Sequence, residues 1–342
     1  MAFCRSWGII GSMGTIILGT GHYVPDRVVT NEELAPRIGT TPDWIEGRTG
    51  IRERRYISRG ESNCSLAETA SRRALADADL EASDIDAIAF ATLSSDACFP
   101  GTGVYLGDAL QIGGKPAIDV RNQCSGFLYA LSVADAWLAT GRYHRVLVVG
   151  SEVHSTSMDF SPDGRNVTAL FGDGAGAVIL GRDPERDGLL DIELGADGSG
   201  AELLWCEVPS ARLHPSMSQA YVAQGRHFPQ MQGRAVLKRA VETLEREITA
   251  AIARCAALTP LDEVLFVPHQ ANKRINEMVA GRVGFAPDQV VHTIELLANT
   301  TAASIPTALD IARKDGRAHP GRVVLMSAFG SGFTWGTATL RL

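Results

Sequence analysis

The sequence lacks the features that mark a membrane protein, an exported protein or a nucleic-acid binder. Its most apolar stretch, residues 7–18 (WGIIGSMGTIIL), is too short and too interrupted by glycine to span a bilayer. It also has no continuous apolar core followed by a small-residue cleavage site, so we expect no signal peptide and a cytoplasmic protein. The 32 Lys and Arg against 39 Asp and Glu give a net charge of −7 without any basic block, which argues against general nucleic-acid binding.

Cysteine is also scarce, and its spacing excludes the usual metal motifs. None of the six cysteines forms a CxxC pair or has a His or Cys neighbour at zinc-ligand spacing, so we predict no metal site. In a reducing cytosol most of them should be small buried apolar side chains. The chain instead has 45% hydrophobic residues and 35 glycines, a composition typical of a folded enzyme with many close backbone approaches.

Strand-like runs alternate with amphipathic helices along the whole chain, and this alternation predicts an α/β fold. A helix over Arg234–Ala257 follows from apolar residues repeating every 3.6 positions, Leu237 among them. A second helix after Pro268 should turn Ile275, Met278 and Val279 inward. The predicted strands cover residues 15–19, 87–92, 116–120, 145–149, 264–267 and 322–326.

The chain also contains an internal duplication. In the first half a strand leads to Cys124, a helix and the strand RVLVVGSE; in the second half VVHTI, read as a strand, leads to Asn299, a helix and RVVLMSA. Each half then reaches a glycine-rich run, FGDGAGAV or FGSGFTWG. We therefore predict two similar units, 15–185 and 186–342, with Cys124 and Asn299 facing a shared centre. Residues 1–14 form an extension, and the irregular segment 201–232 is predicted to be a loop or lid.

Three polar residues at predicted strand ends are candidates for chemistry. Cys124 starts a helix, where free N–H groups and the helix dipole should lower its pKa and favour a nucleophilic thiolate; a buried structural cysteine is the alternative. His269 follows the strand VLFV, at the strand end where α/β proteins bind ligands, although it could be structural. Asn299 precedes a helix, where an ordinary N-cap is the alternative.

Taken together, these three residues suit acyl transfer. A thiolate can carry an acyl group, while a neutral histidine and an asparagine amide can donate hydrogen bonds to an enolate oxygen. A cysteine protease would use the same residue types with the asparagine orienting the histidine. The duplication instead places Asn299 opposite Cys124, which favours both residues facing the substrate.

The sequence closely resembles β-ketoacyl-ACP synthase III of the thiolase superfamily. The matching segments occur in family order from Thr15 to Leu342 and are DWIEGRTGIRER (43–54), NQCSGFLYAL (122–131), FGDGAGAV (171–178), VPHQANKRI (267–275), NTTAASIP (299–306) and AFGSGFTWG (328–336). The resemblance implies a thiolase-like five-layered αβαβα fold and a homodimer. It also implies a ping-pong decarboxylative condensation of an acyl-CoA with malonyl-ACP that initiates type II fatty acid synthesis. No cofactor is implied beyond the CoA thioester and the phosphopantetheine-bound malonate, which are substrates.

The same resemblance assigns roles in the reaction. Cys124 would carry the acyl group, and His269 and Asn299 would stabilise the enolate formed by decarboxylation. The backbone N–H groups of Cys124 and Ser331 would form the oxyanion hole, with Phe329 against the cysteine.

Further positions match the family's substrate-binding residues. Trp44 and Arg165 would flank adenine, Arg48 would reach phosphate, and Asn272 would lie along pantetheine. Trp44 could instead be core, and Arg48 could be an ordinary surface ion pair. Because the acidic carrier protein would be repelled by the net charge of −7, docking should depend on a local basic patch. Its candidates are Lys238, Arg239, Lys273 and Arg274.

Four positions bear on substrate preference. Ser331 replaces the usual middle glycine of its run, Ala298 stands where glycine is usual, and Arg234 stands where an asparagine often contacts pantetheine. These departures leave open a specialised condensing enzyme or acyltransferase of secondary metabolism, and a non-catalytic thiolase-fold subunit is a third hypothesis. Phe99 matches the residue that closes the partner subunit's acyl pocket in short-chain members, which favours small primers.

Overall fold

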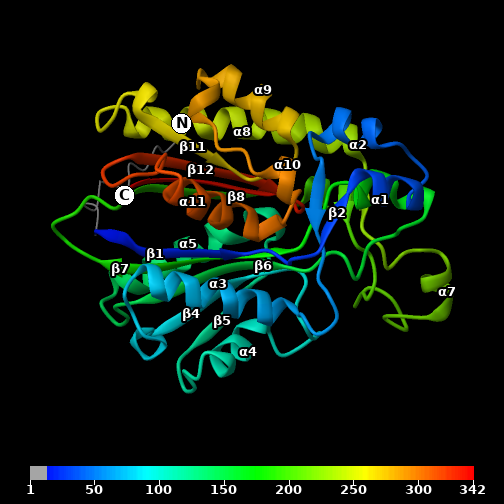
Figure 1. The fold of residues 1–342 in the computed structure, drawn as a ribbon, viewed down its shortest axis with the longest axis horizontal. Helices are drawn as coiled ribbons and strands as arrows, with labels where there is room; N and C mark the ends of the chain where they lie inside the picture. Colours follow the sequence, from blue (N-terminus) through cyan, green and yellow to red (C-terminus); the bar gives the residue numbers. More distant parts are fainter. Residues whose placement is uncertain (1–13) are drawn as a thin grey trace, which may run out of the picture.

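The computed structural model describes residues 14–342, so the predicted extension lies outside the described residues except for Gly14. A first mixed sheet has the strand order β1-β7-β6-β4-β5 (Figure 1). Strands β4, β5 and β6 run parallel, whereas β7 pairs antiparallel with both β6 and β1. The bounds are β1 Thr15–Tyr23, β4 Ala87–Ala91, β5 Ala117–Val120, β6 Val146–Glu152 and β7 Gly174–Arg182.

A second sheet repeats this arrangement in the order β8-β13-β12-β11. Strand β11 is parallel to β12, and β13 is antiparallel to both β12 and β8. The equivalence of β6 with β12 and of β7 with β13 confirms the duplicated fold that the sequence predicts. The bounds are β8 Leu189–Ala196, β11 Val264–Pro268, β12 Val323–Gly330 and β13 Thr334–Arg341.

Helices complete five layers, seen edge-on in Figure 1. Two helices lie between the sheets, where an apolar cluster joins them to both. One pair of helices covers the outer face of the first sheet and another pair that of the second, each over a separate apolar cluster. The central helices are α5 Gly126–Ala139 and α11 Ser304–Lys314; the outer ones are α3 Asn63–Asp77 and α4 Thr102–Ala109, then α8 Gly233–Cys255 and α9 Lys273–Val283.

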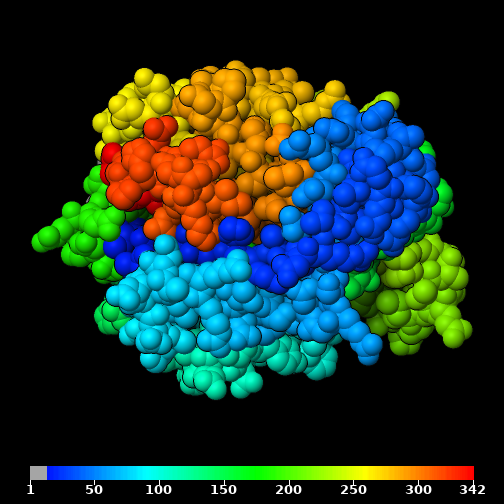
Figure 2. All heavy atoms as spheres, in the orientation of Figure 1, coloured from blue at the N-terminus to red at the C-terminus, as the bar shows by residue number. Residues whose placement is uncertain are grey.

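Two smaller parts lie at one end of the layers. The first packs around its own apolar cluster and contains β2 Val28–Thr30, α1 Asn31–Arg37, α2 Pro42–Thr49 and β3 Glu53–Arg55. The second is segment 201–232, which stands out as a yellow-green protrusion below the blue surface of the first (Figure 2). It carries β9 Leu204–Trp205, α7 Gln219–Ala223 and β10 Gln230–Met231, and β9 pairs with β10 at its base. The short elements α6 Arg165–Thr168 and α10 Ile294–Leu297 complete the fold.

Two local predictions are wrong. Segment 290–294 is not a strand and makes a single β-bridge, between Val290 and Phe266. The Gln270 side chain takes the place of a neighbouring strand: its Nε2 donates to Val291 O, and its Oε1 accepts from Thr293 N and Ile294 N. Asn299 therefore follows the short helix α10 rather than a strand. Leu237 and Met278 are also exposed, by 40% and 43%, because they lie off the faces that α8 and α9 turn to the second sheet.

Candidate active site

Cys124 lies in a single 3-10 turn, Gln123–Ser125, that connects β5 to α5. The preceding Gln123 has a φ of +44°, a sparsely populated conformation of the kind that persists at functional sites. Cys124 packs against the end of β12. A Cβ added to Gly330 would lie 3.0 Å from both Cys124 Cβ and Cys124 N, so only glycine leaves room for the cysteine there.

The protonation state of this thiol differs from the prediction. Cys124 is 8% exposed, and burial raises the pKa of its thiol to about 12, with the Glu152 carboxylate adding to the rise. The free-energy cost of desolvating the thiolate exceeds the stabilisation that the helix N-terminus provides. The predicted lowering of the Cys124 pKa is therefore wrong. The unacylated protein therefore holds a neutral thiol at pH 7.

Glu152 is a component of this environment that the sequence analysis missed. It ends β6 inside the protein and accepts hydrogen bonds from Leu93 N at 3.2 Å and Ser94 Oγ at 2.5 Å. Burial raises the pKa of Glu152 to about 7. The only sequence signal was a carboxylate at the end of an otherwise apolar strand, RVLVVGSE.

His269 follows β11 and is fixed on three sides. Its N–H donates to Ser327 O of β12 at 2.7 Å, its carbonyl accepts from Asn276 Nδ2 at 3.1 Å, and its Nδ1 lies 2.6 Å from Ser304 Oγ. Burial lowers the pKa of His269 to about 3, so the ring is neutral at physiological pH. A cavity of about 30 Å³ beside the ring is lined also by Phe329, which is enough room for a water-sized group.

The hydrogen bonds around Ser304 assign the tautomer of His269. Gln270 N donates to Ser304 Oγ at 3.3 Å, and the hydroxyl has no acceptor among residues 14–342 other than His269 Nδ1. The hydroxyl therefore donates to Nδ1, and the ring proton resides on Nε2. This Nε2 is buried and has no hydrogen-bond partner in the described part of the chain. A buried donor left unpaired costs about 1–3 kcal/mol and indicates a functional position.

Asn299 presents a second free donor. Its backbone N–H donates to Leu170 O, and its carbonyl accepts from Gly172 N. Its side-chain Oδ1 accepts from Thr301 N at 2.8 Å. That contact fixes the amide orientation, and no residue of the described chain accepts from Nδ2. The preceding Ala298 has a φ of +58°, which explains why glycine is usual at this position.

The fold brings these residues to one centre. The turn holding Cys124 packs against the end of β12 and against the turn Thr301–Ala303 that follows Asn299. His269 is hydrogen-bonded to β12 three residues before Gly330, which contacts Cys124. The Cys124 thiol, the buried Nε2 of His269 and the Nδ2 of the buried residue Asn299 thus lie between the two halves, and neither nitrogen has an acceptor within residues 14–342.

The neutral state of His269 carries a pH prediction. Because the lowered pKa keeps the ring unprotonated down to about pH 3, the rate with pre-acylated enzyme should show no inflection from His269 between pH 5 and pH 8. An inflection near pH 7 that disappears in Glu152→Gln would belong to the buried carboxyl. An inflection near pH 6.5 that persists in that variant would contradict a neutral donor.

The predicted adenine-binding residues form one cluster. Trp44 lies on α2, with the Arg48 guanidinium carbon 4.7 Å and that of Arg165 5.9 Å from its ring centroid. Two cations beside one aromatic ring provide a surface for a flat, negatively charged ligand. Asn272 caps α9, and its Nδ2 donates to Arg48 O at 3.0 Å, so it connects this cluster to α9. Arg234, the other residue predicted to border pantetheine, is exposed at the start of α8.

Ser331 has a specific partner. Its hydroxyl donates to Leu204 O in β9, at the base of segment 201–232. The side chain that replaces the usual glycine therefore joins the end of β12 to the predicted lid. Phe329, which precedes it by two residues, contacts the Phe333 ring in a tilted arrangement with ring centroids 4.8 Å apart.

The predicted basic patch is smaller than expected. Lys273 Nζ lies 2.5 Å from Glu295 Oε1, and this ion pair raises the pKa of the lysine. Arg239 Nη1 lies 3.7 Å from Asp197 Oδ2. Lys238 is largely exposed, with Glu242 at 3.9 Å. The Arg274 guanidinium has no acidic partner within residues 14–342, so Arg274 is the strongest remaining candidate.

Two repeated α/β units that enclose a buried cysteine define a thiolase-fold transferase. The family described as "3-Oxoacyl-[acyl-carrier-protein (ACP)] synthase III" matches residues 118–198, and its C-terminal counterpart matches residues 254–342. A β-ketoacyl-[acyl-carrier-protein] synthase III of Laribacter hongkongensis is 44% identical over 95% of this chain and 98% of its own. The chain belongs to the β-ketoacyl-ACP synthase III family, whose members are condensing acyltransferases.

Solved structures agree with this assignment. The 3-oxoacyl-[acyl-carrier-protein] synthase III of Aquifex aeolicus VF5 superposes with a TM-score of 0.87 at 36% identity, covering 96% of this chain and all of that one. The priming β-ketosynthase of the R1128 polyketide biosynthetic pathway gives 0.88 at 32% identity and covers 98% of each chain. The residues 14–342 contain no helix long and apolar enough to cross a membrane.

Proposed function

We propose that this chain condenses an acyl-CoA primer with malonyl-ACP through an acyl-Cys124 intermediate, the step that initiates type II fatty acid synthesis. The observation that carries the proposal is the pair of donors near the buried thiol: the Nε2 of neutral His269 and the Nδ2 of Asn299, neither with a partner in the described chain. Donors kept unpaired by the surrounding chain suit an oxyanion that exists only during the reaction.

The first step is transfer of the acyl group to the cysteine. Cys124 sulfur attacks the thioester carbonyl, the bond from carbon to CoA sulfur breaks, and the thiol proton leaves with CoA as its thiol. Because burial holds the Cys124 pKa high, an exposed thiolate is not maintained between turnovers. The backbone N–H groups of Cys124 and Ser331 would bind the carbonyl oxygen, with Phe329 against the cysteine.

The second step is decarboxylation and carbon–carbon bond formation. Malonyl-ACP loses CO₂, and the electron pair of the broken bond becomes a thioester enolate. His269 Nε2–H and Asn299 Nδ2–H would donate to the enolate oxygen, replacing the partners these groups lack. The enolate carbon attacks acyl-Cys124, and the sulfur leaves and recovers a proton. No resident cofactor takes part in this scheme.

The CoA arm would lie between the arginine–tryptophan cluster and the cysteine. Trp44 and Arg165 would hold adenine, Arg48 would contact phosphate, and Asn272 and Arg234 would border the pantetheine. The cluster supports this because Trp44 is partly exposed between two guanidinium groups that have no carboxylate partner among residues 14–342.

Carrier-protein docking carries a prediction. Arg274→Glu should raise the KM for malonyl-ACP at least about tenfold while changing self-acylation by acyl-CoA less than about twofold, because only the acidic carrier protein needs the surface cation. The control is Arg282→Glu on the same helix, where the arginine already pairs with Glu245 at 2.9 Å. Steady-state kinetics with both substrates measure the two effects; equal effects on both would contradict the docking role.

We also propose a cytoplasmic homodimer. Strand β5 is an edge strand, and exposed apolar side chains gather around it and α4: Phe99, Val104, Tyr105 and Ile118. An exposed edge with such a patch favours pairing with a second copy. Phe99, 86% exposed in one chain, would then reach the partner's acyl pocket.

A specialised condensation in secondary metabolism is the second candidate, favoured by the match to the R1128 priming β-ketosynthase. Product formation from malonyl-ACP and a series of acyl-CoAs of increasing length separates the two functions. The leading proposal predicts the highest kcat/KM with the shortest straight-chain primers, because Phe99 would shorten the pocket. A preference for long or unusual acyl groups would support the second candidate instead.

A further inference from the structure

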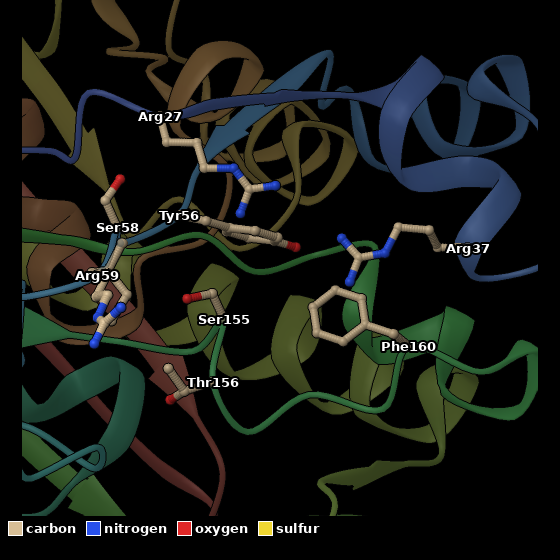
Figure 3. A pocket seen from close by; sticks show the side chains of 9 residues that line it. Arg27, Arg37, Tyr56, Ser58, Arg59, Ser155, Thr156 and Phe160 are labelled. Carbon is tan, nitrogen blue, oxygen red and sulfur yellow. The ribbon is translucent and has the colours of Figure 1, made fainter.

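A pocket separate from Cys124 opens where α1 and the residues after β3 face the loop that follows β6 (Figure 3). Its volume is about 310 Å³, at the lower end of the range for small-molecule sites. Neither Cys124, His269 nor Asn299 lines it. We call it the arginine pocket, after Arg27, Arg37 and Arg59 in its wall.

The charge of the arginine pocket is one-sided. Its lining contains three guanidinium groups and no carboxylate. Arg27 pairs with Glu33 outside the lining at 2.7 Å. The Arg37 guanidinium carbon lies 4.2 Å from the centroid of the Phe160 ring, and Arg37 has no acidic partner from Gly14 onward. Within residues 14–342, Arg59 has no hydrogen bond or ion pair. The nearby Asp173 is buried behind the wall, where it accepts from Ser155 and Ile57 N.

Tyr56 supplies a second, independent observation. The residue is 3% exposed, yet its hydroxyl is buried and has no hydrogen-bond partner among the residues that the structure describes. Figure 3 shows the guanidinium groups of Arg27 and Arg37 turned toward this hydroxyl. Burial raises the Tyr56 pKa to about 12, so the hydroxyl remains a donor at pH 7. The Tyr56 hydroxyl is therefore a buried donor among guanidinium groups, and an anionic ligand would supply the acceptor that it lacks.

We propose that the arginine pocket binds a phosphate-class oxyanion, a phosphate ester or a diphosphate, held by Arg37, Arg59 and the Tyr56 hydroxyl. Arginine forks match phosphate oxygens, and two guanidiniums without acidic partners favour a multiply charged anion over a single carboxylate. Tyr56, Phe160 and Trp44 share one apolar cluster, so this site and the Trp44 cluster are built on the same unit. The bound phosphate could therefore come from CoA itself or from a separate compound.

Calorimetric titration with inorganic pyrophosphate tests the proposal, and binding is its readout, so it does not depend on the condensation reaction. We expect wild-type protein to bind pyrophosphate, Arg37→Gln/Arg59→Gln to weaken binding at least about tenfold, and Tyr56→Phe to weaken it about threefold or more. The control Arg246→Gln/Arg282→Gln removes the same charge from exposed positions on α8 and α9 and should change affinity less than about twofold. Thermal unfolding verifies that every variant is folded.

Further titrations distinguish the source of the phosphate. If CoA excludes pyrophosphate and the pocket variants weaken CoA binding, the substrate's phosphates fill the pocket: a smaller effect on dephospho-CoA assigns the 3′-phosphate, and an equal effect assigns the diphosphate bridge. If pyrophosphate binds equally well to CoA-saturated protein, the ligand is a separate compound, and the proposal also holds. Absence of pyrophosphate binding to wild type, or equal weakening in the pocket and control variants, would overturn it.

Discussion

Cys124→Ala should show no acyl adduct after incubation with acyl-CoA and should lose condensation by at least about 10³-fold, because no other group can take over covalent transfer. The thiol is buried against Gly330 near the unpartnered donors, and none of the other free cysteines within residues 14–342 shares this position. Intact-protein mass measures the adduct, and product formation with malonyl-ACP measures the rate.

The exposed cysteines provide the control. Cys98→Ala and Cys206→Ala remove thiols that are accessible to solvent and should each keep a full adduct. Cys124→Ala replaces a small buried side chain with a smaller one, so thermal unfolding should show a folded protein. An adduct that survives in Cys124→Ala and disappears in either control would move the nucleophile to another cysteine.

The second large effect separates the two half-reactions. His269→Ala and Asn299→Ala should still form the acyl adduct but should each lose about 10²–10³-fold in condensation, because each removes one hydrogen-bond donor to the enolate. The neutral ring, held by Ser304 Oγ at 2.6 Å, and the amide, held by Thr301 N at 2.8 Å, are placed for that task. Single-turnover measurements on pre-acylated protein isolate this step.

A conservative variant sharpens the test for the asparagine. Asn299→Asp keeps the size of the side chain and the oxygen that accepts from Thr301 N, but it removes the Nδ2 donor and adds a charge next to the enolate. Condensation at the wild-type rate in this variant would contradict the donor role. Complete loss of self-acylation in His269→Ala would show that the histidine acts in the first step instead.

Much of the fold follows from local sequence patterns. The short apolar runs became β4, β6, β11 and β12 because β-branched and aliphatic residues pack well on both faces of a buried sheet. The repeated order of strand, polar residue, helix, strand and glycine-rich run predicts the duplication, and the sheets repeat one strand order. Cys124, His269 and Asn299 were identified because polar residues interrupt apolar runs where the chain turns.

The errors arise where a long-range contact decides the outcome. VVHTI has strand-like residues, yet the Gln270 side chain occupies its hydrogen-bonding groups, which no local pattern reveals. The Cys124 pKa was predicted from a helix terminus, but desolvation depends on packing from β12 and on Glu152. The predicted basic patch includes Lys273, but Glu295, from a different part of the chain, forms an ion pair with this lysine in the folded structure.

The arginine pocket could not be predicted for the same reason. Arg27, Arg37 and Arg59 are ordinary charges along the chain, and Phe160 lies about 100 residues away from the nearest of them. Only the packing of the loop after β6 against α1 leaves Tyr56 buried without a partner. An unpaired polar atom is a property of the folded structure and leaves no signal in the sequence.

The central claim, an acyl-Cys124 intermediate on the path to product, is tested most directly by intact-protein mass in two stages. Incubation with acyl-CoA should add one acyl group per chain at Cys124, and malonyl-ACP should then remove it while an equal amount of β-ketoacyl-ACP forms. An acyl adduct that malonyl-ACP leaves unchanged, or β-ketoacyl-ACP formed at the full rate by Cys124→Ala, would contradict the mechanism.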